Sequence, residues 1–164
     1  MPKSSKPRKK YRPKKVFINP AAYAVESATQ LTDHGSYSID WKLRAHISMS
    51  ALEKGEATRD EIEDLIAAHN ITEALVRTRK LDGAQAVTDR SHRAFQSMMD
   101  RCAGRECLAL NYEERAAIND MLDLHDQLMD AITVHQLEEA IAYAKGQLRS
   151  GNFTALIKTK EVIA

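Results

Sequence analysis

Residues 111–132 read NYEERAAINDMLDLHDQLMDAI, and this stretch decides the fold class. Asn111 and Glu114 stand three residues apart at its start, the spacing of a helix N-cap and its capping-box glutamate. Apolar side chains then recur with the 3.6-residue period of an α-helix, at Ile118, Met121, Leu122, Leu128, Met129 and Ile132. The stretch therefore predicts a helix whose apolar stripe must pack against other helices.

Two similar segments precede this helix and predict helices of their own. One begins at a Ser38 N-cap and ends at Gly55. Its expected inward side chains are Ile39, Leu43, Ile47 and Leu52. The other begins with a capping box of Thr58 and Glu61 and ends near Lys80 and Gly83. Its expected inward side chains are Ile62, Leu65, Ile66, Ile71 and Leu75.

Three more helical segments complete the prediction. A helix that stops at Gly104 is expected to bury Val87, Phe95, Met98 and Cys102. Thr133 and Gln136 form a capping box for a helix that ends at Gly151. Its expected inward side chains are Leu137, Ala140, Ile141, Ala144 and Leu148. A short helix is also expected after Asn19–Pro20, through Ala22, Val25 and Ala28.

The positions of the prolines support an all-α fold. All four lie within the first 20 residues, and the following 144 residues have none. A proline in a helix interior costs about 3 kcal/mol or more, so its exclusion suits a helical body. We therefore predict a single all-α domain of five or six helices over residues 19–151. A flexible basic arm at 1–18 precedes it, and a tail at 152–164 follows.

Length and composition narrow the class of protein. The chain has 164 residues, which suits one domain, and 43% of them are hydrophobic. No apolar run of 18 residues is present, and no apolar segment follows the basic N-terminus, so neither a membrane helix nor a secretory signal is expected. The two cysteines cannot build a disulfide framework. These features predict a cytoplasmic protein.

The near-neutral net charge of +1 conceals a strong separation of charge. The arm takes 8 of the 24 basic residues and no acid, so residues 16–164 carry a formal charge of −7. The basic residues of the arm are Lys3, Lys6, Arg8, Lys9, Lys10, Arg12, Lys14 and Lys15. Local charge of this kind, rather than net charge, determines what a surface attracts.

The arm is the strongest functional signal in the sequence. Eight cations on an extended segment attract phosphates by Coulomb forces and counterion release, and Tyr11 can stack on a base. Fifteen extended residues reach about 50 Å, so the arm can contact nucleic acid away from the body. The alternatives are a solubilising tail, an arm folded onto the acidic body, and nonspecific adhesion to RNA. The residues favour neither DNA nor RNA.

A second signal is the acidic segment from Asn111 to Glu139. It has eight acidic residues against Arg115 alone. Four of them, Asp120, Asp123, Asp126 and Asp130, follow the first turn of the helix predicted over residues 111–132. The last three step by three and four residues, which places them on one helix face, where carboxylates can imitate a row of phosphates. A solvated helix face is the simpler interpretation. Changing these three to Lys is expected to leave the fold intact, because the positions are predicted to be exposed.

The remaining reactive residues give weaker signals. His125 lies within the apolar stripe, where a structural role is more common than a role as a functional base with Asp123 or Asp126 nearby. Cys102 and Cys107 lack the second cysteine pair of a zinc site and are expected to be structural thiols. The sequence has no P-loop, GxGxxG or GxSxG motif. We therefore expect no catalytic activity, cofactor or metal.

The arm also carries a resemblance. Residues 7–15, PRKKYRPKK, followed by a proline-free helical body with Leu124-His125-Asp126, resemble small uncharacterised proteins of proteobacterial prophages and other mobile elements. The resemblance covers the arm and, more loosely, the body, and it assigns no residue role. It implies an accessory protein that binds nucleic acid or disables a host factor such as a CRISPR effector.

Two functions follow as expectations. The first is a non-enzymatic phage or mobile-element protein that contacts nucleic acid through its arm, with a body that supplies dimerisation or partner specificity. The second is an inhibitor of the anti-CRISPR or another anti-defence type. Its acidic face would occupy the cationic groove of a host nucleic-acid-binding complex.

Overall fold

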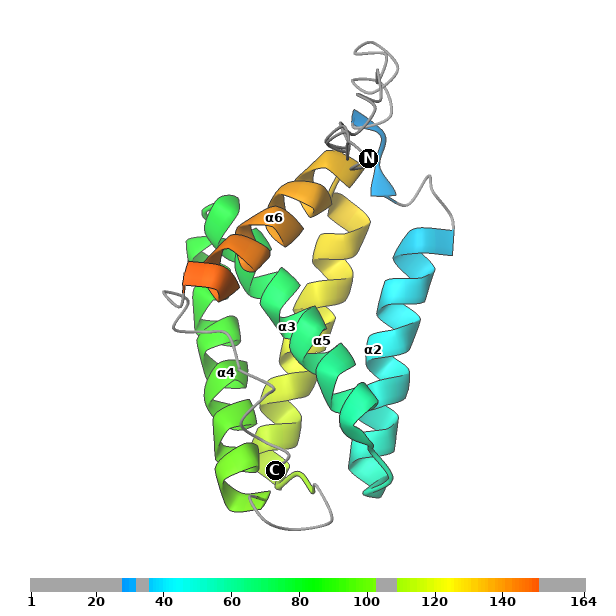
Figure 1. Ribbon diagram of the computed structural model, residues 1–164, viewed down its shortest axis with the longest axis vertical. Helices are drawn as coiled ribbons and strands as arrows, with labels where there is room; N and C mark the ends of the chain where they lie inside the picture. Colours follow the sequence, from blue (N-terminus) through cyan, green and yellow to red (C-terminus); the bar gives the residue numbers. More distant parts are fainter. Residues whose placement is uncertain (1–27, 32–35, 103–108, 151–164) are drawn as a thin grey trace, which may run out of the picture.

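The chain folds as a bundle of helices (Figure 1). The structure is a computed structural model of the 164-residue chain, and it describes residues 28–31, 36–102 and 109–150. These ranges hold five helices and no strand, which confirms the predicted all-α class. The helices are α2 (Ser36–Lys54), α3 (Arg59–Thr78), α4 (Asp82–Cys102), α5 (Tyr112–Ala131) and α6 (Val134–Ser150). The predicted arm and C-terminal tail, and the short helix apart from Ala28, lie outside the described residues.

The helix starts predicted from the three capping boxes are confirmed, but the predicted N-cap at Ser38 is wrong, because α2 begins two residues earlier, at Ser36. Thr58 caps α3, and the Glu61 carboxylate accepts a bond from the Thr58 amide, which completes the capping box. Asn111 and Glu114 form the same reciprocal pair at α5. At the start of α6, the Thr133 amide donates to Gln136 Oε1 at 3.1 Å and the Gln136 amide donates to Thr133 Oγ1 at 3.3 Å. Each pair satisfies amides that have no partner within the helix.

Gly55 ends α2, as predicted, and its conformation explains why. Its φ of 72° lies in the left-handed region, which glycine adopts at little cost. The Gly55 amide bonds to the Leu52 carbonyl at 3.1 Å, and the Glu56 amide bonds to the Ala51 carbonyl at 2.9 Å. This is the Schellman arrangement, which satisfies the last carbonyls of a helix and turns the chain towards α3.

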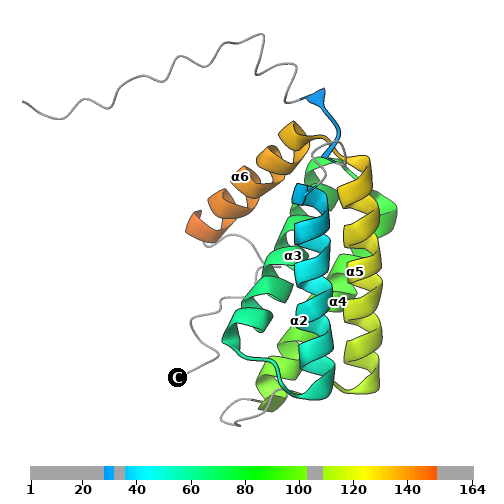
Figure 2. The same ribbon diagram turned by 90° about the vertical axis from the view of Figure 1, so that its right-hand side faces the viewer.

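Helix α3 is the centre of the bundle and contacts each of the other four helices. Helix α5 packs against α2, α3 and α4, and α6 lies diagonally across α3 (Figure 1). Seen from the side, α6 leans away from the bundle, and α2, which lies at the right-hand edge of Figure 1, is in front of the other helices (Figure 2). Residues 28–31 run beside the α5–α6 turn, where the Leu31 amide bonds to the Ile132 carbonyl at 3.0 Å.

The apolar core has two parts, and α3 contributes to both. Its first half joins α2, α4 and α5 around Phe95, Met98, Ile118 and Met121, which are all fully buried. Its second half joins α5, α6 and the buried Leu31. All five side chains that were predicted to point inward from α3 are buried. The bundle therefore forms around a helix whose apolar pattern is clear in the sequence.

The predicted inward face of α2 is wrong. Ile39, Leu43 and Ile47 are 59%, 53% and 57% exposed, and only Leu52 of the predicted set is buried. The buried side of α2 is formed instead by Ala45, Ser48, Met49 and Leu52. The helix has apolar residues on two opposite faces, and the face with the smaller side chains packs against α3 and α5. Leu148 of α6, also predicted to point inward, is 49% exposed.

Candidate functional site: the charged face of α5

The nine residues predicted to contact nucleic acid lie outside the described residues. They are Lys3, Lys6, Arg8, Lys9, Lys10, Tyr11, Arg12, Lys14 and Lys15. The four acidic residues of the alternative function lie on α5, and the structure gives their surroundings. The charged residues around α5 are therefore the part of the candidate site whose geometry the structure describes.

The acidic residues of α5 divide between two neighbouring helices. Towards α2, Asp126 Oδ2 lies 2.9 Å from His46 Nε2, and Asp130 Oδ1 accepts from Lys42 Nζ at 2.5 Å. Towards α4, Asp120 forms an ion pair with Arg90. Asp123 is exposed and has no ion-pair partner among the residues that the structure describes. Three of the four carboxylates thus connect helices of the bundle.

These contacts correct the prediction that Asp123, Asp126 and Asp130 are all exposed. The Asp126 side chain is only 32% exposed, and its Oδ1 atom is buried. The sequence placed these residues on one helix face correctly, but it gave no sign of Lys42 and His46, which lie more than 75 residues earlier in the chain. The partners of these carboxylates come from elements distant in sequence, so local spacing could not reveal them.

The pairing predicts unequal effects for substitutions on this face. Asp126→Lys removes the hydrogen-bond partner of His46 and places an ammonium at a half-buried position, so we expect a loss of about 1–2 kcal/mol in the free energy of unfolding. Asp123→Lys changes an exposed position and is expected to stay within about 0.5 kcal/mol. Urea unfolding followed by circular dichroism measures both. Equal effects of the two variants would contradict the pairing.

At the start of α5, Glu114 holds α4 and α5 together. The residue is 3% exposed and forms an ion pair with Arg101 near the end of α4. Its carboxylate also accepts from Ser97 Oγ at 2.9 Å and from the Asn111 amide at 2.9 Å. A buried carboxylate with this many donors is fully engaged in structure. Glu114 is therefore not an available site for a partner.

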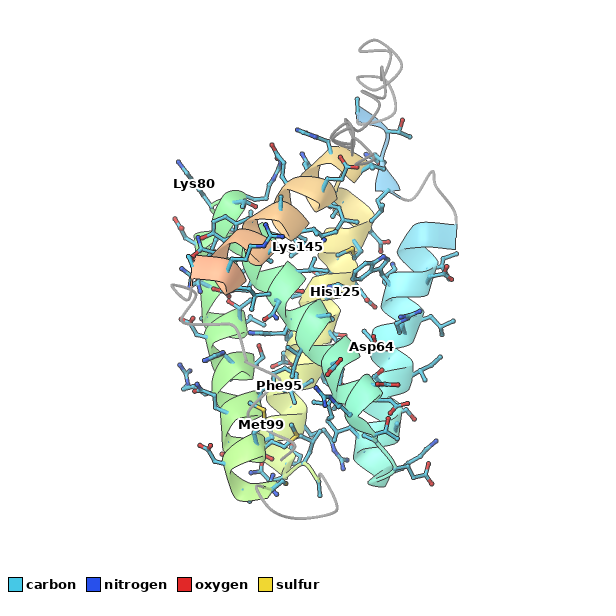
Figure 3. All side chains as sticks on the ribbon, in the orientation of Figure 1. Asp64, Lys80, Phe95, Met99, His125 and Lys145 are labelled. Carbon is cyan, nitrogen blue, oxygen red and sulfur yellow. The ribbon has the colours of Figure 1, made fainter. Side chains whose placement is uncertain are left out.

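His125 lies inside the bundle, fully buried between α5 and α3 (Figure 3). Its Nδ1 atom is 3.0 Å from Thr72 Oγ1, and the Thr72 hydroxyl donates to the Ala68 carbonyl at 2.8 Å. Because that hydroxyl has a single proton, His125 must be the donor through Nδ1–H. The other ring nitrogen, Nε2, then carries no proton. It has no hydrogen-bond partner within the described part of the chain.

Burial lowers the pKa of His125 to about 4, since the charged ring would lose its hydration. The Asp126 carboxylate opposes this change in pKa, while His46 and Lys42 reinforce it. His125 is consequently a neutral imidazole near pH 7. Its position matches a structural histidine of the core, the more common of the two interpretations of this residue.

A second histidine–hydroxyl pair lies between α3 and α4. His69 Nδ1 is 3.0 Å from Ser91 Oγ, and the Ser91 hydroxyl donates to the Thr88 carbonyl at 3.0 Å. The same reasoning makes His69 the donor through Nδ1–H. The His69 ring also stacks on that of His92, with centroids 6.0 Å apart. This pair could not be predicted from the sequence, because its members are 22 residues apart and neither belongs to a motif.

Glu73 belongs to a layer of buried polar side chains on α3 that also includes His69 and Thr72. The residue is fully buried, forms an ion pair with Arg77 one turn later, and accepts from Gln85 Nε2 of α4 at 3.1 Å. A signal for this layer was present in the sequence, since His69, Asn70, Thr72 and Glu73 interrupt the apolar pattern in the middle of α3. Such an interruption in a buried helix indicates polar side chains with specific partners.

The comparisons assign no family to this arrangement. No protein-family model, curated protein or solved structure matches the chain. Within residues 28–31, 36–102 and 109–150, no group of three or more His, Cys, Asp or Glu side chains is placed to hold a metal ion. The helices in those ranges also include none that is long and apolar enough to cross a membrane.

Proposed function

We propose that this chain is a non-enzymatic accessory protein of a phage or mobile element that contacts nucleic acid through residues 1–15. The observation that carries the proposal is the charge of the arm, eight cations with no acid ahead of a body with a formal charge of −7. Cations in this number bind phosphate with a strength that depends on salt rather than on base sequence.

The contacts of the acidic residues on α5 support this proposal over two alternatives that need a free acidic face. These alternatives are an arm folded onto the acidic body and an inhibitor that binds a basic host protein. Asp120 and Asp130 each have a cation of the body beside them, Arg90 and Lys42, and Asp126 is hydrogen-bonded to His46. A carboxylate with an intramolecular partner attracts the arm, or a basic host protein, less than a free one does. Asp123 remains as an exposed acid on this part of α5. The acidic face therefore competes only weakly with the phosphates of nucleic acid for the arm.

The salt dependence of binding tests the proposal. We expect full-length protein to bind short fluorescent DNA and RNA, with log K falling against log salt at a slope of about −6 to −7 if all eight cations engage. Deleting residues 1–15 is expected to flatten the slope and abolish binding, because the remaining body is acidic. Fluorescence anisotropy from about 50 to 300 mM salt gives both values.

A matched variant separates charge from length. Replacing the eight Lys and Arg residues of the arm by Gln keeps its prolines and its Tyr11, and should have the same effect as the deletion. Nucleic-acid binding that persists unchanged in either variant would reject the arm as the site.

The alternative inhibitor function requires a different readout. Asp123→Lys is the appropriate variant, because changes at Asp126 and Asp130 also break contacts with α2. If a basic host protein binds the acidic face, this variant should weaken its capture from a nuclease-treated bacterial lysate. If the arm is the site, the variant should bind nucleic acid as well as the parent protein or better.

A further inference from the structure

Helix α2 has an exposed apolar stripe opposite its buried side. Ile39, Leu43 and Ile47 are each more than half exposed, whereas Ala45 and Met49 are buried against the core. Helix α2 packs against α3 and α5, and it lies at the edge of the bundle in Figure 1 and in front of the other helices in Figure 2. Three large aliphatic side chains in a row on one helix are typical of a surface that another helix covers.

The spacing of the stripe specifies how a second helix would lie on it. The three residues are four positions apart, so they form a single ridge along α2. If a second copy of α2 lies antiparallel with its centre at Leu43, the stripe faces itself, and Ile39 of each copy lies opposite Ile47 of the other. A two-fold axis at Leu43 therefore buries all three side chains of both copies at once.

The charges beside the stripe fit the same two-fold axis. Asp40 and Arg44 lie on the flank nearest α3, and the axis brings this flank of one copy against the same flank of the other. Asp40 then lies about 3 Å along the helix axis from Arg44 of the partner subunit, since two residues at 1.5 Å rise separate them. The contact forms twice, once in each direction.

Both residues are available for such a contact. Arg44 is 72% exposed in its side chain, and its nearest acid in the chain, Asp64 of α3, is 3.7 Å away. Asp64 is labelled in Figure 3, on the side of α3 that faces α2. Asp40 is exposed and has no ion-pair partner in the described ranges. A hollow of about 290 Å³ between α2 and α3, lined by Asp40, Arg44 and Asp64, leaves room on this flank for a side chain of the partner.

The opposite flank of the stripe carries Lys42 and His46, which the same axis also brings near their counterparts. The Lys42 ammonium already has Asp130 of α5 beside it, and the His46 ring lies against Asp126. The carboxylates reduce the repulsion between like charges that the dimer would otherwise have on this side.

We propose that the outer face of α2 is the interface of a homodimer in which two copies of Ile39, Leu43 and Ile47 pack antiparallel, flanked by reciprocal Asp40–Arg44 ion pairs. Since each copy contributes one helix face, the interface belongs to the small and weak class. The proposal is independent of the arm and of the nucleic acid that the arm is proposed to bind.

Sedimentation equilibrium of the full chain, from about 5 to 500 µM, tests the interface. The parent protein should show a monomer–dimer equilibrium. Leu43→Glu should lower the association constant at least tenfold, because it places a charge at the centre of the proposed interface. Leu148→Glu, at another exposed leucine, is the matched control and should leave the equilibrium unchanged. A parent chain that stays monomeric over this range, or a dimer unaffected by Leu43→Glu, would overturn the proposal.

A mixing experiment tests the ion pairs without relying on a single variant. Asp40→Arg gives each copy two cations on this flank, and Arg44→Asp gives each copy two acids, so each variant alone should dimerise less than the parent. An equimolar mixture restores both attractive pairs, so it should form a heterodimer at least as tight as the parent dimer. A mixture that associates no better than the two separate variants would contradict the proposed register.

Discussion

Phe95→Ala is expected to lower the free energy of unfolding by about 3–5 kcal/mol, the range for removing a buried phenylalanine. Phe95 is fully buried inside the bundle, where its ring lies 5.7 Å from that of His69. The loss combines the transfer free energy of the ring with the cavity left among helices that can only partly close around it. Urea unfolding followed by circular dichroism measures the change.

Tyr112→Ala is the matched control, since it removes an aromatic ring that is 85% exposed. We expect its effect to stay within about 0.5 kcal/mol. If the two substitutions proved equally destabilising, the assignment of Phe95 to the core would be wrong.

Acidification from pH 7 to pH 5 should lower the free energy of unfolding by about 2 kcal/mol through His125 alone. Its pKa is about 4 in the folded protein and 6.5 without the shift, so the unfolded chain binds more protons between these values. The contribution of His125 is complete above about pH 6.5 and is lost as the pH falls towards 4. The total loss is about 3 kcal/mol, at 1.36 kcal/mol per pKa unit.

The variant His125→Leu isolates this contribution. It has no titrating ring and leaves the Thr72 hydroxyl bonded to the Ala68 carbonyl. Its stability should therefore depend less on pH between 7 and 5 than that of the parent protein, by about 2 kcal/mol over the interval. His135→Leu, at an exposed histidine of α6, is the control. A pH dependence that is identical in the parent and in His125→Leu would show that His125 is not buried in its neutral form.

The features predicted correctly from the sequence are those that depend on residues of a single helix. The starts of α3, α5 and α6 were predicted because a capping box acts between residues three apart. The inward side chains of α3 were predicted because they are its large apolar residues, and in the second half of the helix every residue from 68 to 76 is buried, whichever way it points. Both signals are contained within a single helix.

Interactions between helices were not visible in this way. On α2, the apolar pattern marked two faces, and the larger residues Leu43 and Ile47 indicated the wrong one. The partners of the α5 acids, and the hydroxyl partner of His125, 53 residues away, depend on which helices become neighbours. Of the candidate sites, the sequence defined the composition of the arm and the position of the acids on α5, but not the cations beside them.

The central place of α3 in the bundle limits how its sequence can change over evolution. Twelve of its 20 residues are buried, and successive turns face different neighbours. Each of these positions must keep a shape and polarity that suit a separate partner, whereas the outer turns of α6 face fewer such demands. Among relatives of this protein, residues 62–76 should therefore drift most slowly, and Glu73 should vary only together with Arg77 and Gln85.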